Sequence, residues 1–190
     1  MKSKGSAHLH QEDKFMKRSY LKPIETFSVA AGLALLFMGT IGIAKAQSPQ
    51  EGVTSNKKQV EAMLIAWKNG TGELLPLLDD NVRWTITGNS LGAGTTVGKP
   101  ELVEKILNPF GARFASSANK FKPTTIRGIY GDGDTVIANF DGYGISNDGK
   151  PYSNSYVWIL RMHGGKVVEA TAFFDAVAFD DLWTRVKPQP

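Results

Sequence analysis

Four predicted strands and three tight turns lie in one uninterrupted segment, FKPTTIRGIYGDGDTVIANFDGYGISNDGKPYSNSYVWILRMHGGKVVEATAFF (residues 121–174). The turns Gly131–Asp134, Asn147–Lys150 and His163–Gly165 carry the Asp-Gly or Gly-Gly pairs that supply positive φ angles in hairpins. The strands between them are expected at 124–130, 135–146, 152–162 and 167–174. Consecutive hairpins of this kind predict an antiparallel meander.

The chain on either side of this segment is predicted to be mostly helical. Apolar residues recur at helical spacing in 54–69 and in 100–114, where Pro109 is expected to bend or break the helix. Asp175 is expected to cap a last helix at 176–186. A short helix at 73–78, a half-buried strand at 82–87 and a glycine-rich loop at 88–98 complete the order.

Helices followed by hairpins are typical of the α+β class, in which helices cover one face of a bent antiparallel sheet. The predicted architecture is a cone-shaped α+β barrel, with a curved antiparallel sheet wrapped around N-terminal helices. One domain at residues 54–186 is expected, preceded by a short polar tether at 47–53.

Charge is divided unevenly along the chain. The formal net charge of +4 comes from 22 basic and 18 acidic side chains, of which residues 1–46 hold seven and three. The remaining 15 basic and 15 acidic side chains cancel. A domain without a basic patch has nothing to neutralise nucleic-acid phosphates, so a small molecule or a protein is the expected partner.

The first 46 residues have the features of a secretion signal peptide. Basic residues precede the apolar run Phe27–Ala44, and Ala44-Lys45-Ala46 matches the small-residue cleavage pattern. Cleavage is predicted between Ala46 and Gln47, with export to the periplasm or secretion, and Met16 is an alternative start. An uncleaved membrane anchor is the other interpretation, because the apolar run approaches the length that spans a bilayer.

The residue types needed for several common chemistries are missing. The sequence has no cysteine, which excludes disulfides, thiolate nucleophiles and zinc–thiolate sites. His163, the one histidine after the leader, lies on a predicted hairpin turn. That position weighs against a histidine metal cluster and against a Ser-His-Asp triad. No cofactor and no metal are therefore expected.

Several local phrases, in their order and spacing, resemble the SnoaL-like branch of the nuclear-transport-factor-2-like, cystatin-type cone fold. They are Leu77-Leu78-Asp79-Asp80-Asn81-Val82 before a strand with Trp84, Gly98-Lys99 before a helix, Asp148-Gly149-Lys150 in a hairpin, Gly165-Lys166-Val167-Val168, and Phe173-Phe174-Asp175. The resemblance covers about residues 54–185 and extends distantly to limonene epoxide hydrolase and ketosteroid isomerase-like proteins. It implies a cone that hosts isomerases, cyclases, hydrolases and non-catalytic binders.

Epoxide hydrolases of this type resemble one another in an Arg-x-Asp pair on the long central strand and an Asp on the last strand. The matching positions here are Asn139, Asp141 and Ala172. On the first strand, Arg83 and Thr85 stand where those enzymes have Tyr and Asn. Because those enzymes hold a water between an acid and a base, and only Asp141 is kept, epoxide hydrolysis by that route is not expected.

Asp141 is the candidate general base. Alternation places Asn139, Asp141 and Tyr143 on one face of their strand and Phe140 on the other, and the polar face is predicted to line the cone. A carboxylate buried there would have a raised pKa and could take a proton near neutral pH. Tyr143 is a second catalytic candidate and Asn139 a candidate ligand contact, while an exposed strand is the structural alternative.

Two aromatic side chains are further candidate ligand contacts. Tyr156 shares a strand face with Tyr152, Asn154 and Trp158, and could meet an apolar or ring-shaped molecule. Trp84 lies on the first predicted strand. A buried aromatic row is also typical of a packed core. The glycine-rich loop at 88–98 is either a gate to the cone or an ordinary surface loop.

Two hypotheses of function follow. In the first, an exported domain encloses a small apolar or ring-shaped molecule and performs a cofactor-free isomerisation or cyclisation with Asp141 as the base. In the second, the domain is a non-catalytic binding or assembly module. Its outward sheet face, including Val157 and Ile159, would then form a homodimer.

Overall fold

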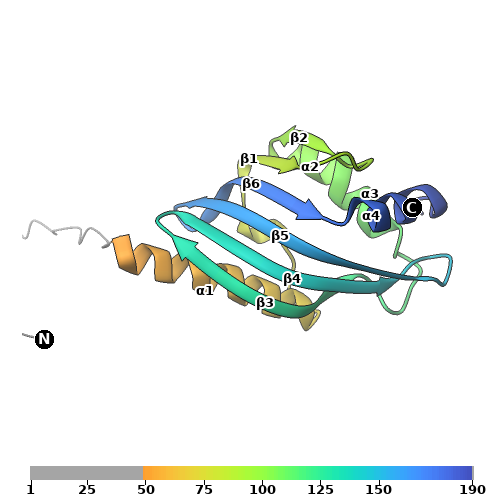
Figure 1. Cartoon of the computed structure of the whole chain (residues 1–190), viewed down its shortest axis with the longest axis horizontal. Coiled ribbons are helices and arrows are strands. Elements are labelled where there is room, and N and C mark those ends of the chain that lie inside the picture. The colour runs from red at the N-terminus through yellow and green to blue at the C-terminus, as the bar shows by residue number, and fades with distance from the viewer. Residues whose placement is uncertain (1–48, 190) are drawn as a thin grey trace, which may run out of the picture. The chain divides into compact units, whose positions relative to one another are not determined.

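The computed structural model describes residues 49–189, and Figure 1 shows how their helices and strands are arranged. In chain order the elements are α1 (Pro49–Lys68), the 3-10 helix η1 (Leu75–Leu77), β1 (Leu78–Ile86), β2 (Gly94–Val97), α2 (Lys99–Leu102), the π-helical turn η2 (Val103–Leu107), α3 (Asn108–Ala112), β3 (Lys122–Asp132), β4 (Thr135–Ile145), β5 (Pro151–His163), β6 (Lys166–Phe174) and α4 (Ala176–Arg185). The predicted signal peptide and its cleavage point lie outside the described residues.

The six strands form one curved sheet in the order β2-β1-β6-β5-β4-β3. Neighbouring strands run antiparallel, except that β1 and β6 are parallel. The predicted meander of four strands is therefore present, and β1 joins it beside the last of them. These elements confirm the predicted α+β class with a curved sheet.

Helices cover the inner face of the sheet. α1 contacts β3 and β4, and its Val60 and Leu64 belong to the same buried cluster as Phe140 of β4. α4 contacts β5, and its Leu182 belongs to a smaller buried cluster with Tyr152. The outer face of the sheet carries no helix in Figure 1.

The predicted hairpin turns are confirmed by their backbone angles. Gly133 between β3 and β4 has φ 55°, and Gly149 between β4 and β5 has φ 79°. Gly164 and Gly165 between β5 and β6 have φ 56° and 76°. Side chains rarely adopt such angles, so glycine at these positions fixes where each strand reverses.

Several element boundaries differ from the prediction. α1 begins at Pro49, so residues 49–53 are helical rather than part of a tether. Residues 73–78 form only the short η1, and β1 begins at Leu78 instead of Val82. The predicted loop at 88–98 contains β2, which pairs with β1 from Arg83–Val97 to Ile86–Gly94.

The predicted break at Pro109 takes the form of a wider helical turn. The chain stays helical from Lys99 to Ala112, with the π-helical turn η2 immediately before α3. Asn108 N donates to the carbonyl of Val103 across this turn. Proline has no amide hydrogen and its ring collides with the carbonyl four residues earlier, here that of Lys105. A π-helical turn just before Pro109 accommodates both defects without ending the helix.

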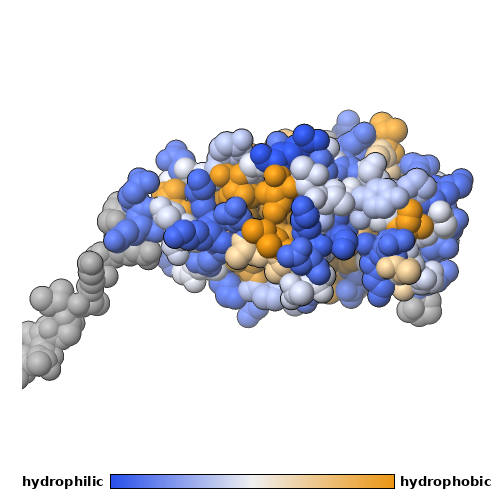
Figure 2. Space-filling view, turned by 90° about the horizontal axis from the view of Figure 1, so that it is seen from below, coloured by the Kyte–Doolittle hydropathy of each residue, from blue (hydrophilic) through white to orange (hydrophobic). Residues whose placement is uncertain are grey.

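Figure 2 shows the face of the molecule that is lowest in Figure 1. Hydrophilic residues cover most of it, and one compact group of hydrophobic residues lies near its middle. Among residues 49–189, no helix combines the length and the apolar character needed to cross a membrane.

Candidate functional site

A partly open cavity of about 70 Å³ is lined by residues from the inner face of the sheet and from the helices. Nine of its fourteen lining residues are aromatic: Trp67, Trp84, Phe110, Phe121, Phe140, Tyr156, Trp158, Phe174 and Phe179. The other five are Leu74, Ile86, Ile106, Leu107 and Ala172. Strand alternation places the sheet residues there, because β5 buries every second side chain from Tyr152 to Met162.

The rings hold one another in fixed orientations. Trp84 meets Trp158 edge to face, with centroids 5.2 Å apart and planes at 83°. Phe140 stacks on Tyr156 at 5.1 Å and 14°, and meets Trp158 at 4.8 Å and 82°. Such pairs favour these geometries beyond simple burial of area. The cavity wall is therefore shaped by ring-to-ring packing between β1, β4 and β5.

One hydrogen-bonded chain reaches this apolar wall. Asn154 Nδ2 donates to Tyr152 Oη at 3.0 Å, and Tyr152 Oη lies 3.0 Å from Tyr156 Oη. The backbone of Asp175 fixes Asn154, because its carbonyl accepts from Nδ2 at 2.9 Å and its amide donates to Oδ1 at 2.9 Å. Tyr152 Oη thus accepts from Asn154, and either hydroxyl can be the donor in the bond between the two tyrosines.

Burial keeps both phenols neutral. It raises the pKa of Tyr152, and it raises the pKa of Tyr156 well above the usual value for tyrosine. A neutral phenol can donate a hydrogen bond, whereas a phenolate cannot. Tyr156 therefore lines the cavity wall as a neutral hydroxyl throughout the physiological pH range.

The prediction that the polar face of β4 lines the cone is wrong. Val136, Ala138 and Phe140 are fully buried on the inner face, so the alternate residues Asn139, Asp141 and Tyr143 lie on the outer face. Tyr143 is 42% exposed. Alternation separates the two faces of a strand correctly, but it does not say which face meets the helices. The large apolar ring of Phe140 takes the inner position.

Asp141 takes part in an ion pair on that outer face. Arg127 of β3 donates from Nε to Oδ1 at 2.9 Å, and its Nη2 lies 2.7 Å from Oδ2. Ser155 of β5 donates to Oδ1 at 2.8 Å. The hydrogen bond from Arg127 is the main reason why the pKa of Asp141 is lowered. Asp141 therefore links three strands as a carboxylate, with a shift opposite to the one that a base near neutral pH needs.

Trp84 and Tyr156 do line the cavity, and a ligand contact at either residue stays a prediction. The residues missed from the sequence come mainly from other elements: Trp67 of α1, Phe110 of α3, Phe121 before β3 and Phe179 of α4. Helical spacing marks Trp67, Phe110 and Phe179 as parts of apolar helix faces, but it does not say that these faces and Phe121 converge on one cavity.

A second, more polar chamber of about 280 Å³ adjoins the cavity. It shares Trp84, Ile86 and Ile106 with the cavity, and its other lining residues are Leu91, Gly92, Ala93, Gly94, Thr95, Thr96 and Lys105. Leu91 N donates to Asp180 Oδ1 of α4 at 2.7 Å, which ties the loop to that helix. The predicted glycine-rich loop thus forms the wall of a chamber beside the apolar cavity.

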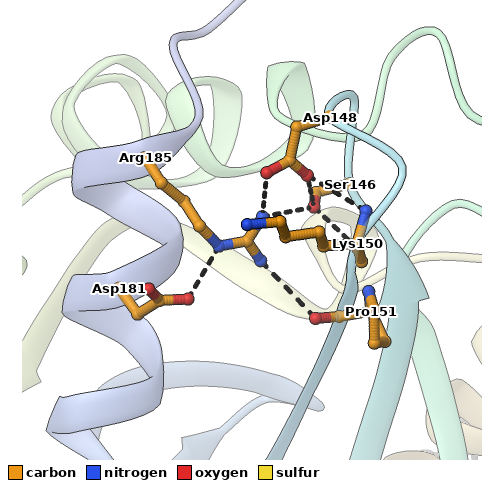
Figure 3. A network of polar contacts seen from close by, with 6 residues as sticks. All are labelled: Ser146, Asp148, Lys150, Pro151, Asp181 and Arg185. Atoms are coloured by element: carbon orange, nitrogen blue, oxygen red, sulfur yellow. Dashed lines mark hydrogen bonds and ion pairs between the residues drawn. The ribbon is translucent and has the colours of Figure 1, made fainter.

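Arg185 holds α4 against the turn between β4 and β5, as Figure 3 shows. It pairs with Asp148, donates to Ser146 Oγ at 3.1 Å, and donates from Nε to Asp181 Oδ2 at 2.7 Å. Ser146 Oγ in turn donates to Asp148 Oδ1 at 2.6 Å. The bond from Arg185 holds the pKa of Asp148 well below its usual value. This network helps to fix α4, whose Phe179 lines the cavity.

Other predicted site features have simpler roles. Asp175 caps α4, accepting bonds from Val177 N at 2.8 Å and Ala178 N at 3.3 Å, as predicted. His163 is exposed at the end of β5. Within residues 49–189, no three His, Asp or Glu side chains are placed to hold a metal ion.

The outer sheet face also has an apolar part, formed by Ile137, Val157, Ile159 and Phe173. Ile137 lies opposite Ile159, and Val157 lies opposite Phe173, on three neighbouring strands. Ile137, Ile159 and Phe173 are 37%, 36% and 43% exposed. We call these four residues the outer apolar patch.

A family model for the SnoaL-like domain matches residues 60–170, and a search of curated proteins finds no significant match. A protein of unknown function with a cystatin-like fold from Xanthomonas campestris has 25% sequence identity and a TM-score of 0.54, covering 68% of this chain and 98% of its own. An NTF2-like protein from Burkholderia thailandensis has 20% identity and a TM-score of 0.51, covering 71% and 98%. A protein from Jannaschia sp. CCS1, assigned to the SnoaL-like polyketide cyclases, has 14% identity and a TM-score of 0.53, covering 74% and 98%.

Proposed function

The chain belongs to the SnoaL-like domain family, and we propose that it binds a small, apolar, ring-shaped organic molecule in the cavity between sheet and helices. The observation that carries this proposal is the cavity wall itself, in which nine of fourteen residues are aromatic. Flat apolar molecules pack well against such walls, with one or two polar groups fixing their orientation.

The Tyr156 hydroxyl is the proposed orienting group. It is hydrogen-bonded to Tyr152, which accepts from Asn154. A ligand with a hydroxyl group near Tyr156 would form a further hydrogen bond with this hydroxyl, which has both donor and acceptor capacity.

The proposal is ligand binding without acid–base catalysis by Asp141. None of the fourteen cavity-lining residues is a carboxylate, a histidine or a lysine, while Asp141 is paired with Arg127 on the other side of the sheet. Isomerisation or cyclisation with a pocket carboxylate as base therefore has no support from the residues around this cavity.

Naphthalene titrated into the protein tests the proposal. Trp67, Trp84 and Trp158 line the cavity, so binding is expected to quench tryptophan fluorescence at one molecule per chain. Ala172→Leu fills the cavity from β6, where Ala172 is 2% exposed, and is expected to abolish binding. Ala62→Leu, at an exposed position of α1, is the matched control. Equal binding by both variants would place the naphthalene elsewhere and contradict the proposal.

A second candidate function, assembly into a homodimer, is favoured by the outer apolar patch. Its aliphatic and aromatic side chains cross β4, β5 and β6 on the face that carries no helix. Contiguous exposed apolar residues on a sheet face often mark a contact with another protein chain. A dimer across this face leaves the ligand cavity on the opposite side of each sheet, so the two functions are compatible.

Sedimentation equilibrium distinguishes the dimer from the monomer. The unaltered protein is expected to sediment as a dimer, and Ile159→Lys as a monomer, because it places a charge within the outer apolar patch. Ile65→Lys changes an isoleucine of α1 that is 44% exposed and lies outside the patch, and it should leave the dimer intact. A monomeric unaltered protein, or a dimeric Ile159→Lys variant, would exclude this interface.

We also propose that the domain acts in the periplasm or outside the cell, after loss of a signal peptide that ends at Ala46. Cleavage there would leave α1 complete, because that helix begins at Pro49. N-terminal sequencing of protein from its source is expected to start at Gln47. A sequence that begins at Met1 or Met16 would contradict removal of the leader.

A further inference from the structure

The apolar cavity and the polar chamber are separated by three shared side chains, Trp84, Ile86 and Ile106. Trp84 and Ile86 belong to β1, which is paired on both sides by β2 and β6, and they are only 4% and 5% exposed. Ile106 belongs to the π-helical turn η2 and is partly exposed. It is the shared side chain that can move without disturbing the sheet.

The apolar cavity alone is too small for a ring ligand. Its volume is about 70 Å³, whereas an engineered apolar cavity that binds benzene has roughly 150 Å³. A bound ring must therefore extend beyond the present wall, and the adjoining chamber supplies about 280 Å³. Displacement of Ile106 would join the two spaces.

The loop above Ile106 leaves no room for a larger side chain. A β-carbon placed on Gly92 would lie 3.9 Å from Ile106 Cδ1 and 2.9 Å from the ring of Phe179. Gly92 therefore lets the loop pack directly against the ring of Phe179, with Ile106 at ordinary contact distance. The hydrogen bond between Leu91 N and Asp180 holds the loop in this position, so the space available to Ile106 is set by both η2 and the loop.

The two chambers differ in chemistry. The inner one is aromatic, whereas Thr95, Thr96 and Lys105 are among the residues that line the outer one. Lys105 is paired with Glu101 at 2.5 Å, but its side chain remains 62% exposed. An ammonium group has three N–H donors, so it retains donors for an oxygen acceptor in this chamber.

We infer that Ile106 is a movable partition, and that the ligand is an amphiphilic ring compound spanning both chambers. Its apolar ring lies in the inner chamber, and an oxygen acceptor such as a carboxylate lies beside Lys105 in the outer one. This inference rests on the proposed function, because it concerns the ligand of the same cavity. Ile106 then controls which molecules enter the apolar cavity and how fast they enter it.

Stopped-flow tryptophan fluorescence with 2-naphthoate and naphthalene tests the partition. Ile106→Ala is expected to raise the association rate of both probes about tenfold, equivalent to removing about 1.4 kcal/mol from the barrier. Ile106→Phe is expected to slow association. If the alanine variant unfolds, Ile106→Met takes its place in the measurement, because methionine has a similar volume and a more flexible side chain. Ile65→Ala, on an exposed part of α1, should match the unaltered protein.

The polar end is tested by comparing the two probes. The unaltered protein is expected to bind 2-naphthoate more tightly than naphthalene, and Lys105→Met is expected to remove that preference. Unchanged rates in all Ile106 variants, with naphthalene still bound, would overturn the partition and leave the proposed function intact. Binding only by Ile106→Ala would support the partition and contradict ligand binding by the unaltered protein. Absence of binding in every variant would overturn both.

Discussion

Phe140 and Asp141 are neighbours in β4 with opposite environments. The ring of Phe140 is fully buried, 4.8 Å from that of Trp158, whereas Asp141 accepts hydrogen bonds from Arg127 and Ser155 on the outer face. Arg127 lowers the pKa of Asp141, so the carboxyl group stays ionised near neutral pH. At the scale of single residues, the cavity wall therefore offers rings and the Tyr156 hydroxyl and carries no charged side chain.

Asp141→Asn is expected to leave naphthalene affinity within about twofold of the unaltered protein, a change of less than about 0.5 kcal/mol. It should lower the urea midpoint only slightly, because the pair with Arg127 is largely exposed. The carboxylate contributes above about pH 4 and loses its effect as the pH falls, since its pKa is lower in the folded protein. A tenfold loss of affinity would return Asp141 to the ligand site.

The sequence predicted the two faces of β4 and β5 but assigned the wrong face of β4 to the interior. Alternation alone supported two assignments, and the polar row looked like a site because a site needs polar groups. Phe140 favoured the opposite face of β4 as the inner one, because burying its ring stabilises the fold by about 1.5–3 kcal/mol. Tyr156 and Trp84 were ligand-contact candidates and both lie at the inner wall; for Tyr156 the signal was the aromatic row on its strand face.

At the scale of elements, two glycines of β4 let the chain before β3 lie on the inner face of the sheet. A β-carbon on Gly142 would lie 2.3 Å from the ring of Phe121, and one on Gly144 would lie 2.7 Å from Phe121 Cα. Asn119 O accepts from Ile145 N at 2.8 Å in the same region. Because Gly142 and Gly144 have no side chains, Phe121 has room to lie on β4 and to complete the cavity wall.

Gly144→Ala is expected to lower the free energy of unfolding by about 1–3 kcal/mol, because the added methyl group meets backbone that must shift. It should also weaken naphthalene binding, since Phe121 lines the cavity. Gly111→Ala is the control, because a β-carbon there meets nothing within 4 Å, and it should be neutral or slightly stabilising. Equal stability of the two variants in urea would contradict the close approach at Gly144.

The network around Arg185 makes the attachment of α4 dependent on pH. Asp148→Asn is expected to lower the free energy of unfolding by about 1 kcal/mol at pH 7, a value limited by partial exposure of the pair. The folded-state pKa of Asp148 is depressed, so this contribution is present above about pH 4 and is lost as the pH falls below it. Urea unfolding at pH 7 and pH 3 should show a gap that narrows at the lower pH, because the folded-state pKa of Asp148 lies well below its usual value.

Asp132→Asn, which removes an exposed aspartate outside this network, controls for the loss of one negative charge. The difference in free energy of unfolding between Asp132→Asn and the unaltered protein should be the same at pH 7 and pH 3. A gap between Asp148→Asn and the unaltered protein that persists unchanged at pH 3 would show that the network does not depend on the ionised carboxylate.

The sequence predicted the hairpins well and two other elements poorly. Each hairpin had its own glycine at a position that needs positive φ, which is local information. β2 was assigned to a loop because its pairing with β1 depends on a contact between separate segments. Pro109 predicted that the helix would be disturbed there but not in which form, because a break, a bend and a wider turn all relieve the same clash.

At the scale of the whole molecule, the curved sheet and its helices enclose an aromatic cavity, and the polar network of Asn154 and the tyrosines reaches its wall. The order and spacing of local phrases predicted this fold, and the match to the SnoaL-like domain over residues 60–170 confirms it. The sequence did not predict the cavity, because its wall combines side chains from four strands, four helical elements and two connecting segments. Families of this fold differ in what those side chains are.

A crystal structure of the protein soaked with naphthalene is the most direct test of ligand binding inside the cone. We expect electron density for one naphthalene between Trp84, Phe140 and Tyr156, with Ile106 displaced toward the outer chamber. The rings of the wall should keep their present orientations, because they are fixed by one another. Density on the outer sheet face alone, or an unchanged cavity at saturating naphthalene, would contradict the account.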